Sequence, residues 1–100
     1  VIDARGQLVE IGDDCFVGHG VMFVNDLFEG GEPARGDRTK WRATHVGNRV
    51  SIGSNATILP VTIADGCVIG AGAVVTRDLT QPGVYAGNPA RLLRKFEVKA

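Results

Sequence analysis

A repeat of six residues organises most of this sequence. A large aliphatic or aromatic residue, usually followed by Gly or Ala, recurs at every sixth position through residues 11–23, 46–58 and 63–75. The nine residues at the repeating positions are Ile11, Val17, Phe23, Val46, Ile52, Ile58, Ile63, Ile69 and Val75. A half-buried strand alternates every second residue and an amphipathic helix repeats every three to four residues, so neither element explains a period of six.

A coil of short parallel strands does explain this period. If each hexad forms one flat face and three faces complete a turn, the repeating residues point to a common axis and successive turns stack about 4.8 Å apart. Backbone amides then pair between turns, and the repeating residues form apolar columns inside a narrow prism. The sequence therefore predicts a single all-β domain, a parallel β-helix spanning residues 1–100. Because three turns cannot bury their own ends and flat sides, we expect caps and an oligomer.

Three segments depart from the repeat. Residues 1–10 do not hold the register, because Arg5 falls where an apolar residue is due, and we expect this stretch to cap the coil. Residues 25–45 form an inserted loop rich in Gly and charged residues, and such a long connection is typical of a functional loop. Residues 89–96 predict a short C-terminal helix that seals the last turn, with Pro89 in its first turn.

Composition and charge exclude several classes of protein. The 11 Lys and Arg balance 11 Asp and Glu, so no nucleic-acid partner is expected. No apolar run approaches the roughly 20 residues that span a bilayer, and the first residues lack a secretory signal, so we expect a cytoplasmic protein with no membrane partner. Cys15 and Cys67 are too few for a disulfide framework and are expected to be small core residues.

Charge is polarised along the chain. Residues 1–37 contain eight acidic and two basic residues, a net charge of −6, so the rest of the chain carries +6. The basic residues are concentrated toward the C-terminus, where a compact anionic ligand would meet them.

With the hexads, the loop and the tail in view, the chain resembles the left-handed β-helix, hexapeptide-repeat acyltransferases over roughly residues 9–96. The segments that carry the resemblance are Ile52–Pro60, Ile69–Asp78 and Ala86–Arg91. Within that family, Gly18–Asp26 is most similar to the branch that N-acetylates amino sugars carried on nucleotides. The resemblance implies a left-handed parallel β-helix, a homotrimer, and acetyl-coenzyme A as co-substrate in the cleft between neighbouring coils, with no metal.

The family pattern also implies residues that contact the cofactor. In this sequence they are Gly70, Ala71, Gly72, Thr76, Arg77, Arg91 and Arg94. The arginines in the tail are candidate phosphate partners, because coenzyme A is polyanionic and a guanidinium group binds phosphate through two hydrogen bonds. The small residues permit close approach of the pantetheine arm to the backbone.

Acyl transfer to an amine needs positioning of the two reactants and a route for one proton. In galactoside-type members a histidine on the inserted loop acts as the base, whereas here the corresponding stretch begins with Asn25 and Asp26 and lacks it. Asn25 is a candidate to orient the acceptor, and Asp26 to accept a proton or hold a hydroxyl. His19, outside the repeating position, is the candidate general base, and His45 is a weaker one.

The sequence leaves open two alternative functions and the identity of the acceptor. A carbonic anhydrase-like zinc enzyme on the same coil needs three histidines, and this chain has two. A non-catalytic scaffold, or an enzyme truncated at its N-terminus, also fits so short a coil. The loop offers Phe28, Trp41 and three arginines, which suit a nucleotide-linked amino sugar but also smaller amines or alcohols.

Overall fold

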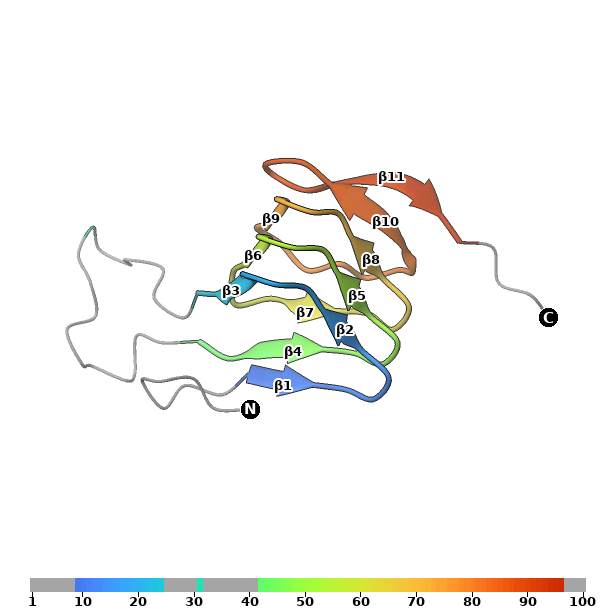
Figure 1. Ribbon diagram of the computed structural model, residues 1–100, viewed down its shortest axis with the longest axis horizontal. Coiled ribbons are helices and arrows are strands. Elements are labelled where there is room, and N and C mark those ends of the chain that lie inside the picture. The colour runs from blue at the N-terminus through green and yellow to red at the C-terminus, as the bar shows by residue number, and fades with distance from the viewer. Residues whose placement is uncertain (1–8, 25–30, 32–41, 97–100) are drawn as a thin grey trace.

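The computed structural model describes residues 9–24, 31 and 42–96. The secondary-structure elements of these residues are short strands, and the chain winds as a coil about one axis (Figure 1). The strands are β1 (Val9–Ile11), β2 (Phe16–Val17), β3 (Met22–Phe23), β4 (Thr44–Val46), β5 (Ser51–Ile52), β6 (Thr57–Ile58), β7 (Thr62–Ile63), β8 (Val68–Ile69), β9 (Val74–Val75), β10 (Gly83–Ala86) and β11 (Arg91–Lys95). No membrane-spanning helix is found in these described residues.

The strands form the three flat faces of a prism. The first face is the sheet β1-β4-β7, the second face is β11-β10-β8-β5-β2, and the third face is β3-β6-β9. Every pairing between turns is parallel, and only β10 and β11 pair antiparallel. The register aligns the nine repeating residues in three columns, which are Ile11, Val46 and Ile63; Val17, Ile52 and Ile69; and Phe23, Ile58 and Val75. The three-sided coil predicted from the hexads is confirmed.

The columns form the core of the prism. All six repeating residues of the second and third turns are buried, and Ile52 and Ile58 have no exposed area. Burying a side chain of this size contributes about 1.5–3 kcal/mol. In the first turn Val17 is 40% exposed, because no described turn covers that end of the coil. Cys67 is fully buried and Cys15 partly buried, so both lie at small core positions as predicted.

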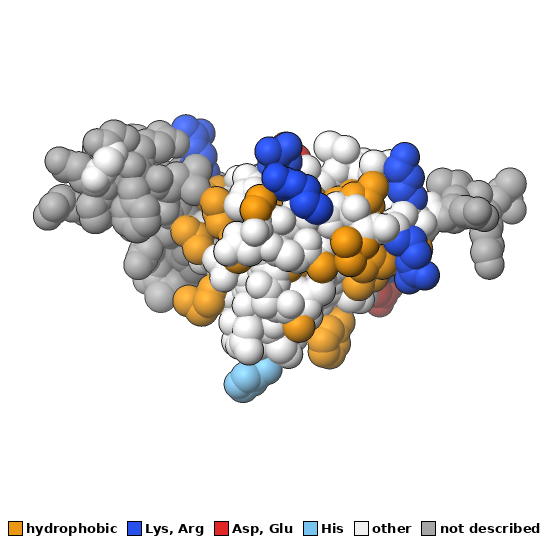
Figure 2. Space-filling view, turned by 90° about the horizontal axis from the view of Figure 1, so that it is seen from above, with side chains coloured by type: hydrophobic (Ala, Val, Ile, Leu, Met, Phe, Trp, Pro, Cys, Tyr) orange, Lys and Arg blue, Asp and Glu red, His pale blue; other side chains and the backbone are white. Residues whose placement is uncertain are grey.

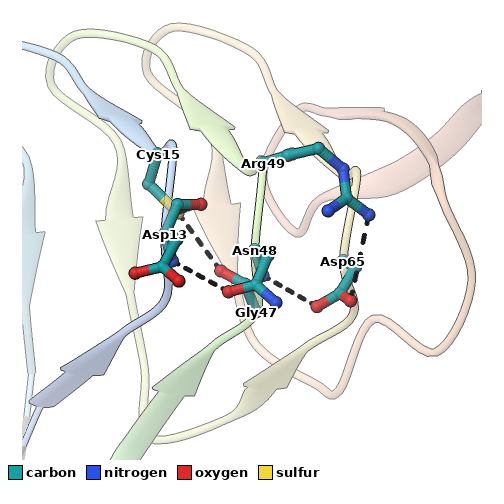
Figure 3. Close-up of polar contacts among 6 residues, drawn as sticks. All are labelled: Asp13, Cys15, Gly47, Asn48, Arg49 and Asp65. Carbon is teal, nitrogen blue, oxygen red and sulfur yellow. Dashed lines mark hydrogen bonds and ion pairs between the residues drawn. The ribbon is translucent and has the colours of Figure 1, made fainter.

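Polar side chains link the turns at the corner between the first and second faces (Figure 3). The backbone N–H of Asp13 donates to Asn48 Oδ1 at 2.8 Å, and the N–H of Asn48 donates to Asp65 Oδ1 at 2.7 Å. The Cys15 thiol donates to the Gly47 carbonyl at 3.1 Å. One side chain per turn therefore satisfies an N–H of the turn before it, and this ladder holds the spacing of the coil at the corner.

The predicted C-terminal helix at 89–96 is wrong. Residues Arg91–Lys95 form β11, which pairs antiparallel with β10 and places Leu92 opposite Tyr85. A helix of eight residues is marginal on its own, because nucleation is costly and few hydrogen bonds repay it. The free edge of β10 offers backbone partners instead, and Leu92 packs against the core at the end of the coil.

Two predicted boundaries also move. Val9 is 4% exposed and starts β1, which pairs with β4, so the coil begins inside the stretch that was expected to be a cap. Thr44 starts β4 and is buried beside the core, so the inserted segment ends before His45, which lies in a strand. In both strands the residue two before the repeating position also points inward, as strand alternation requires.

Candidate functional site

Most of the predicted site residues of the coil lie along the corner between the second and third faces. This site corner consists of residues 18–20, 53–55 and 70–72. The N–H of Asn55 donates to the His19 carbonyl at 2.9 Å, and the N–H of Gly72 donates to the Ser54 carbonyl at 2.9 Å. His19, Asn55 and Gly72 therefore belong to successive turns, which stack about 4.8 Å apart. All three are exposed. The predicted base thus lies in line with the predicted cofactor-binding residues of the third turn.

The third turn of the site corner presents bare backbone. Gly72 has a φ of +71°, and a Cβ placed on it would find no other atom within 4 Å. In the first turn a Cβ on Gly20 would instead collide with Oδ1 of Asn55. An extended ligand arm can therefore approach the chain closely at Gly72, whereas at Gly20 the space is already filled by a side chain.

Asn55 is the residue of the site corner that sequence reasoning missed. Its φ is +62°, in the left-handed region that Asn tolerates better than most residues, and its side chain lies over Gly20 toward the turn of His19. The alignment of hexads contained the signal, because Gly20, Asn55 and Gly72 occupy the same slot of their repeats. An amide at this place can donate and accept hydrogen bonds between the predicted base and the predicted cofactor-binding residues.

A recess of about 190 Å³ lies at the C-terminal end of the coil. It is lined by Arg77, Asp78, Leu79, Thr80, Gln81, Tyr85, Ala90, Arg91 and Leu92. The Arg91 guanidinium donates to the Ala90 carbonyl at 3.2 Å. Burial raises the pKa of the Tyr85 hydroxyl, with a smaller contribution from Cys67, and this hydroxyl donates to the Gln81 carbonyl at 2.7 Å. The recess is smaller than the 300–1,000 Å³ usual for a small-molecule site, so it holds only part of a large ligand.

The arginines predicted to contact the cofactor gather at this same end. Arg77 and Arg91 line the recess, and Arg94 follows on β11, where its guanidinium lies 5.7 Å from the centre of the Phe96 ring. Seen from above, Lys and Arg side chains lie along the upper edge and the right-hand side of the view with hydrophobic side chains between them, and little acidic surface shows (Figure 2). Thr76 is exposed and adjoins Arg77 in the chain. The arrangement suits an anion.

His45 lies elsewhere. It points outward from the first face, which does not contribute to the site corner, and its Nδ1 is 2.9 Å from Oε2 of Glu10 on β1. His19 and His45 are therefore on different sides of the coil, and the described residues bring no group of three metal-ligating side chains together. The described residues therefore contain no set of ligands that would support the zinc enzyme considered as an alternative.

Asn25 and Asp26, the other two predicted catalytic residues, lie outside the described residues. The same holds for Phe28, Trp41, Arg35 and Arg38 of the inserted loop. The chain enters the loop directly after Val24, whose N–H donates to the Ile58 carbonyl at 2.8 Å on the third face.

The outward sides of the three faces differ in polarity. On the first face the outward residues of successive turns are Glu10, His45 and Thr62. On the second and third faces they are largely apolar, namely Phe16, Ser51, Val68 and Val84, and Met22, Thr57 and Val74. Phe16 is 64% and Met22 63% exposed. The two apolar faces meet at the site corner.

Comparison with known proteins agrees with the repeat and the fold. A family model described as the hexapeptide repeat of succinyl-transferase matches residues 44–77. Over 93% of the chain, 32% of residues are identical to a chloramphenicol acetyltransferase of Agrobacterium fabrum, 54% of which is covered. A hexapeptide-repeat acetyltransferase of Vibrio cholerae, solved with acetyl-coenzyme A, is 26% identical with a TM-score of 0.73, over 90% of this chain and 50% of that one.

A polysialic acid O-acetyltransferase is also similar, with 29% identity and a TM-score of 0.71 over 92% of this chain and 47% of that one. The chain thus spans about half the length of these relatives. The fold is the left-handed parallel β-helix of hexapeptide repeats that the sequence predicted. In its repeat and its fold, the chain is similar to hexapeptide-repeat acetyltransferases.

Proposed function

We propose that this chain transfers an acetyl group from acetyl-coenzyme A to a small acceptor at the site corner. The observation that carries the proposal is that His19, Asn55 and Gly72 lie on one corner of three successive turns, beside an end of the coil that carries Arg77 and Arg91. A corner with polar side chains, together with a cationic recess at the end of the coil, suits a ligand with a long neutral arm and a polyanionic head.

The donor fits the residues present. Arg77 and Arg91 at the recess, with Arg94 beyond it, would bind the phosphates, because guanidinium groups match phosphate in charge and shape. The bare backbone at Gly72 leaves room for the pantetheine arm. Acetyl-coenzyme A supplies a thioester, whose carbonyl carbon is open to attack by an amine or an alcohol.

In the proposed reaction the acceptor nitrogen or oxygen forms a bond to this carbonyl carbon and the carbon–sulfur bond breaks. His19 takes the proton that the acceptor loses, and the leaving thiolate is protonated to give coenzyme A. Asn55 would hold the acceptor or the carbonyl oxygen through its amide. Most of the rate then comes from positioning, which is worth up to about 7–11 kcal/mol.

The site is proposed to lie between copies of the chain in a homotrimer. The second and third faces expose Phe16 and Met22 in their outward columns, and apolar faces of this kind favour burial against another protein surface. Packing there would turn the site corner into a cleft. A recess of about 190 Å³ in one chain also leaves most of a coenzyme uncovered without a neighbour.

For the acceptor we propose an amino sugar carried on a nucleotide, oriented by Asn25 and Asp26. The support is the resemblance of residues 18–26 to enzymes with that acceptor, together with the aromatic and basic residues of the loop. A hydroxyl acceptor is the second candidate, favoured by the similarity to a polysialic acid O-acetyltransferase.

Release of free thiol from acetyl-coenzyme A, measured against a panel of amino sugars, nucleotide-linked amino sugars and plain sugars, tests the proposal. We expect turnover with at least one amine, and turnover only with plain sugars would move the acceptor to a hydroxyl. His19→Gln is expected to lower kcat by about 100-fold, in the range usual for loss of a general base. His45→Gln, on the first face, is the matched control and should leave kcat unchanged. Silence across the panel would favour the scaffold.

A further inference from the structure

The predicted base His19 lies opposite Ser54 on the next turn of the coil. Val17 pairs with Ile52, so two residues further on His19 is set against Ser54. The N–H of Asn55 donates to the His19 carbonyl at 2.9 Å, in agreement with this register at the corner. The turns stack about 4.8 Å apart, and both side chains are exposed. An imidazole and a hydroxyl therefore occupy the same slot on adjacent turns of the site corner.

Other places in this fold show side chains that bridge such a step. On the first face Glu10 and His45 are register partners on adjacent turns, and Nδ1 of His45 lies 2.9 Å from Oε2 of Glu10. At the corner between the first and second faces, Asn48 fills the hexad slot that Ser54 fills at the site corner. Its Oδ1 accepts a hydrogen bond from the N–H of Asp13, one turn earlier, at 2.8 Å (Figure 3). Side chains thus reach the adjacent turn both on a face and at a corner.

Few side chains of the site corner can accept a hydrogen bond from His19. The acceptors among them, besides the imidazole itself, are Oγ of Ser54 and Oδ1 of Asn55. The Asn55 side chain lies over Gly20, one residue beyond His19, whereas Ser54 is opposite His19 itself. The residues of the site corner include no carboxylate of the kind that Glu10 offers on the first face. The hydroxyl of Ser54 is therefore the acceptor that the register sets against this imidazole.

The position of the proton decides whether a histidine can act as a base. Neutral imidazole carries one N–H, and the hydrogen bond made by one ring nitrogen decides which nitrogen is left free. With Nδ1–H donating to Ser54, Nε2 of His19 keeps a lone pair for the proton of the acceptor. A hydroxyl can accept this hydrogen bond before and after proton transfer, because imidazole and imidazolium both carry the Nδ1–H.

We propose that Ser54 is a positioning residue, whose hydroxyl accepts a hydrogen bond from Nδ1–H of His19 and so presents Nε2 to the acceptor. The inference deepens the proposed acetyl transfer and takes its catalytic meaning from it. During transfer the proton leaving the acceptor nitrogen or oxygen goes to Nε2, and the proton on Nδ1 stays there. No bond to Ser54 forms or breaks.

Nitrogen-15 NMR of the histidine side chains tests this assignment without any substrate. At about pH 8.5, where histidine side chains are ordinarily neutral, wild-type His19 is expected to carry its proton on Nδ1. Ser54→Ala should move the proton to Nε2, the form that a free histidine side chain prefers. Alanine is tolerated in this slot, because Ala71 fills it one turn later. A proton on Nε2 of His19 in the wild type, or an unchanged tautomer in Ser54→Ala, would overturn the proposal.

The second histidine provides the control within the same spectrum. The chain has two histidines, and His19→Gln identifies the signals of each. Nδ1 of His45 faces Glu10, so His45 should keep its proton on Nδ1 in every variant. Thr62→Val is the matched control, because it removes a hydroxyl one turn after His45 just as Ser54→Ala does one turn after His19. Neither tautomer and no kinetic constant should change in Thr62→Val. If Asn55→Ala moved the His19 proton and Ser54→Ala did not, Asn55 would be the orienting residue instead.

Steady-state kinetics separate a positioning role from binding. Ser54→Ala is expected to lower kcat about 2–10-fold with both KM values unchanged, the effect of one neutral hydrogen bond. Ser54→Thr keeps the hydroxyl and should restore kcat. An unchanged kcat in Ser54→Ala, or a change in KM alone, would contradict the positioning role. Absence of turnover with every acceptor would refute the proposed function by itself, because the tautomer measurement needs no substrate.

Discussion

Replacing Ile52 by alanine measures how much the interior columns hold this fold together. Ile52 has no exposed area and packs between Val17 and Ile69 in the column of the second face. The change removes three carbons, each worth about 0.8 kcal/mol on transfer, and leaves a cavity in a narrow prism that cannot collapse freely. We expect the free energy of unfolding to fall by about 3–4 kcal/mol, out of about 5–15 kcal/mol for a domain of this size.

Val17→Ala is the matched control in the same column. Its side chain is 40% exposed at the open end of the coil, so losing two carbons there should cost less than about 1 kcal/mol. Both values are read from urea unfolding followed by circular dichroism, with the denaturant slope unchanged between variants. Equal losses for the two variants, or a larger loss at Val17, would refute the stacking of columns.

Three further predictions follow from particular positions. Gly53→Ala should destabilise the chain by about 1–3 kcal/mol, because its Cβ would lie 2.5 Å from the Ala71 nitrogen, whereas Gly72→Ala, in open space, should cost about 1 kcal/mol through its φ alone; urea unfolding compares the two. Burial raises the pKa of the Cys67 thiol above its usual 9.0, so the folded state keeps the proton longer than the unfolded state, and stability should fall as the pH rises above about 9; thermal unfolding of Cys67→Ala should lose the decline that begins near pH 9 and keep the one that the raised pKa of Tyr85 adds at higher pH. Arg91→Ala should raise KM for acetyl-coenzyme A about tenfold with kcat nearly unchanged, and an unchanged KM in steady-state assays would remove Arg91 from the donor site.

The coil was predictable from sequence because large apolar residues at a spacing of six are enough to specify this fold. Each repeating residue points to the axis, and the observed registers follow from aligning the three groups of hexads, which the inserted loop and the five-residue step from Ile58 to Ile63 separate. The end of the chain was not predictable in this way. Leu92 and Phe96 fit the apolar side of a helix as readily as an edge strand. The segment becomes the strand β11 because the coil leaves an edge of β10 with which it can pair.

The site was predictable only in part, for a similar reason. The hexads put His19 in the slot of Ser54 and Ala71, one residue before the slot of Gly72, so their position on one corner could have been read from the repeat. Asn55 was overlooked because the chemistry of a corner residue depends on the turn beneath it, here a glycine that leaves room for its side chain. The pairing of His45 with Glu10 joins residues 35 positions apart, and it became visible only once β1 and β4 were in register.

A crystal structure with bound coenzyme A tests the central claim most directly. The account predicts density for the pantetheine arm along Gly70–Gly72 and for the phosphates beside Arg77 and Arg91, with a second copy of the chain closing the other side. Coenzyme A bound along Glu10, His45 and Thr62 on the opposite face, with the site corner empty, would contradict it.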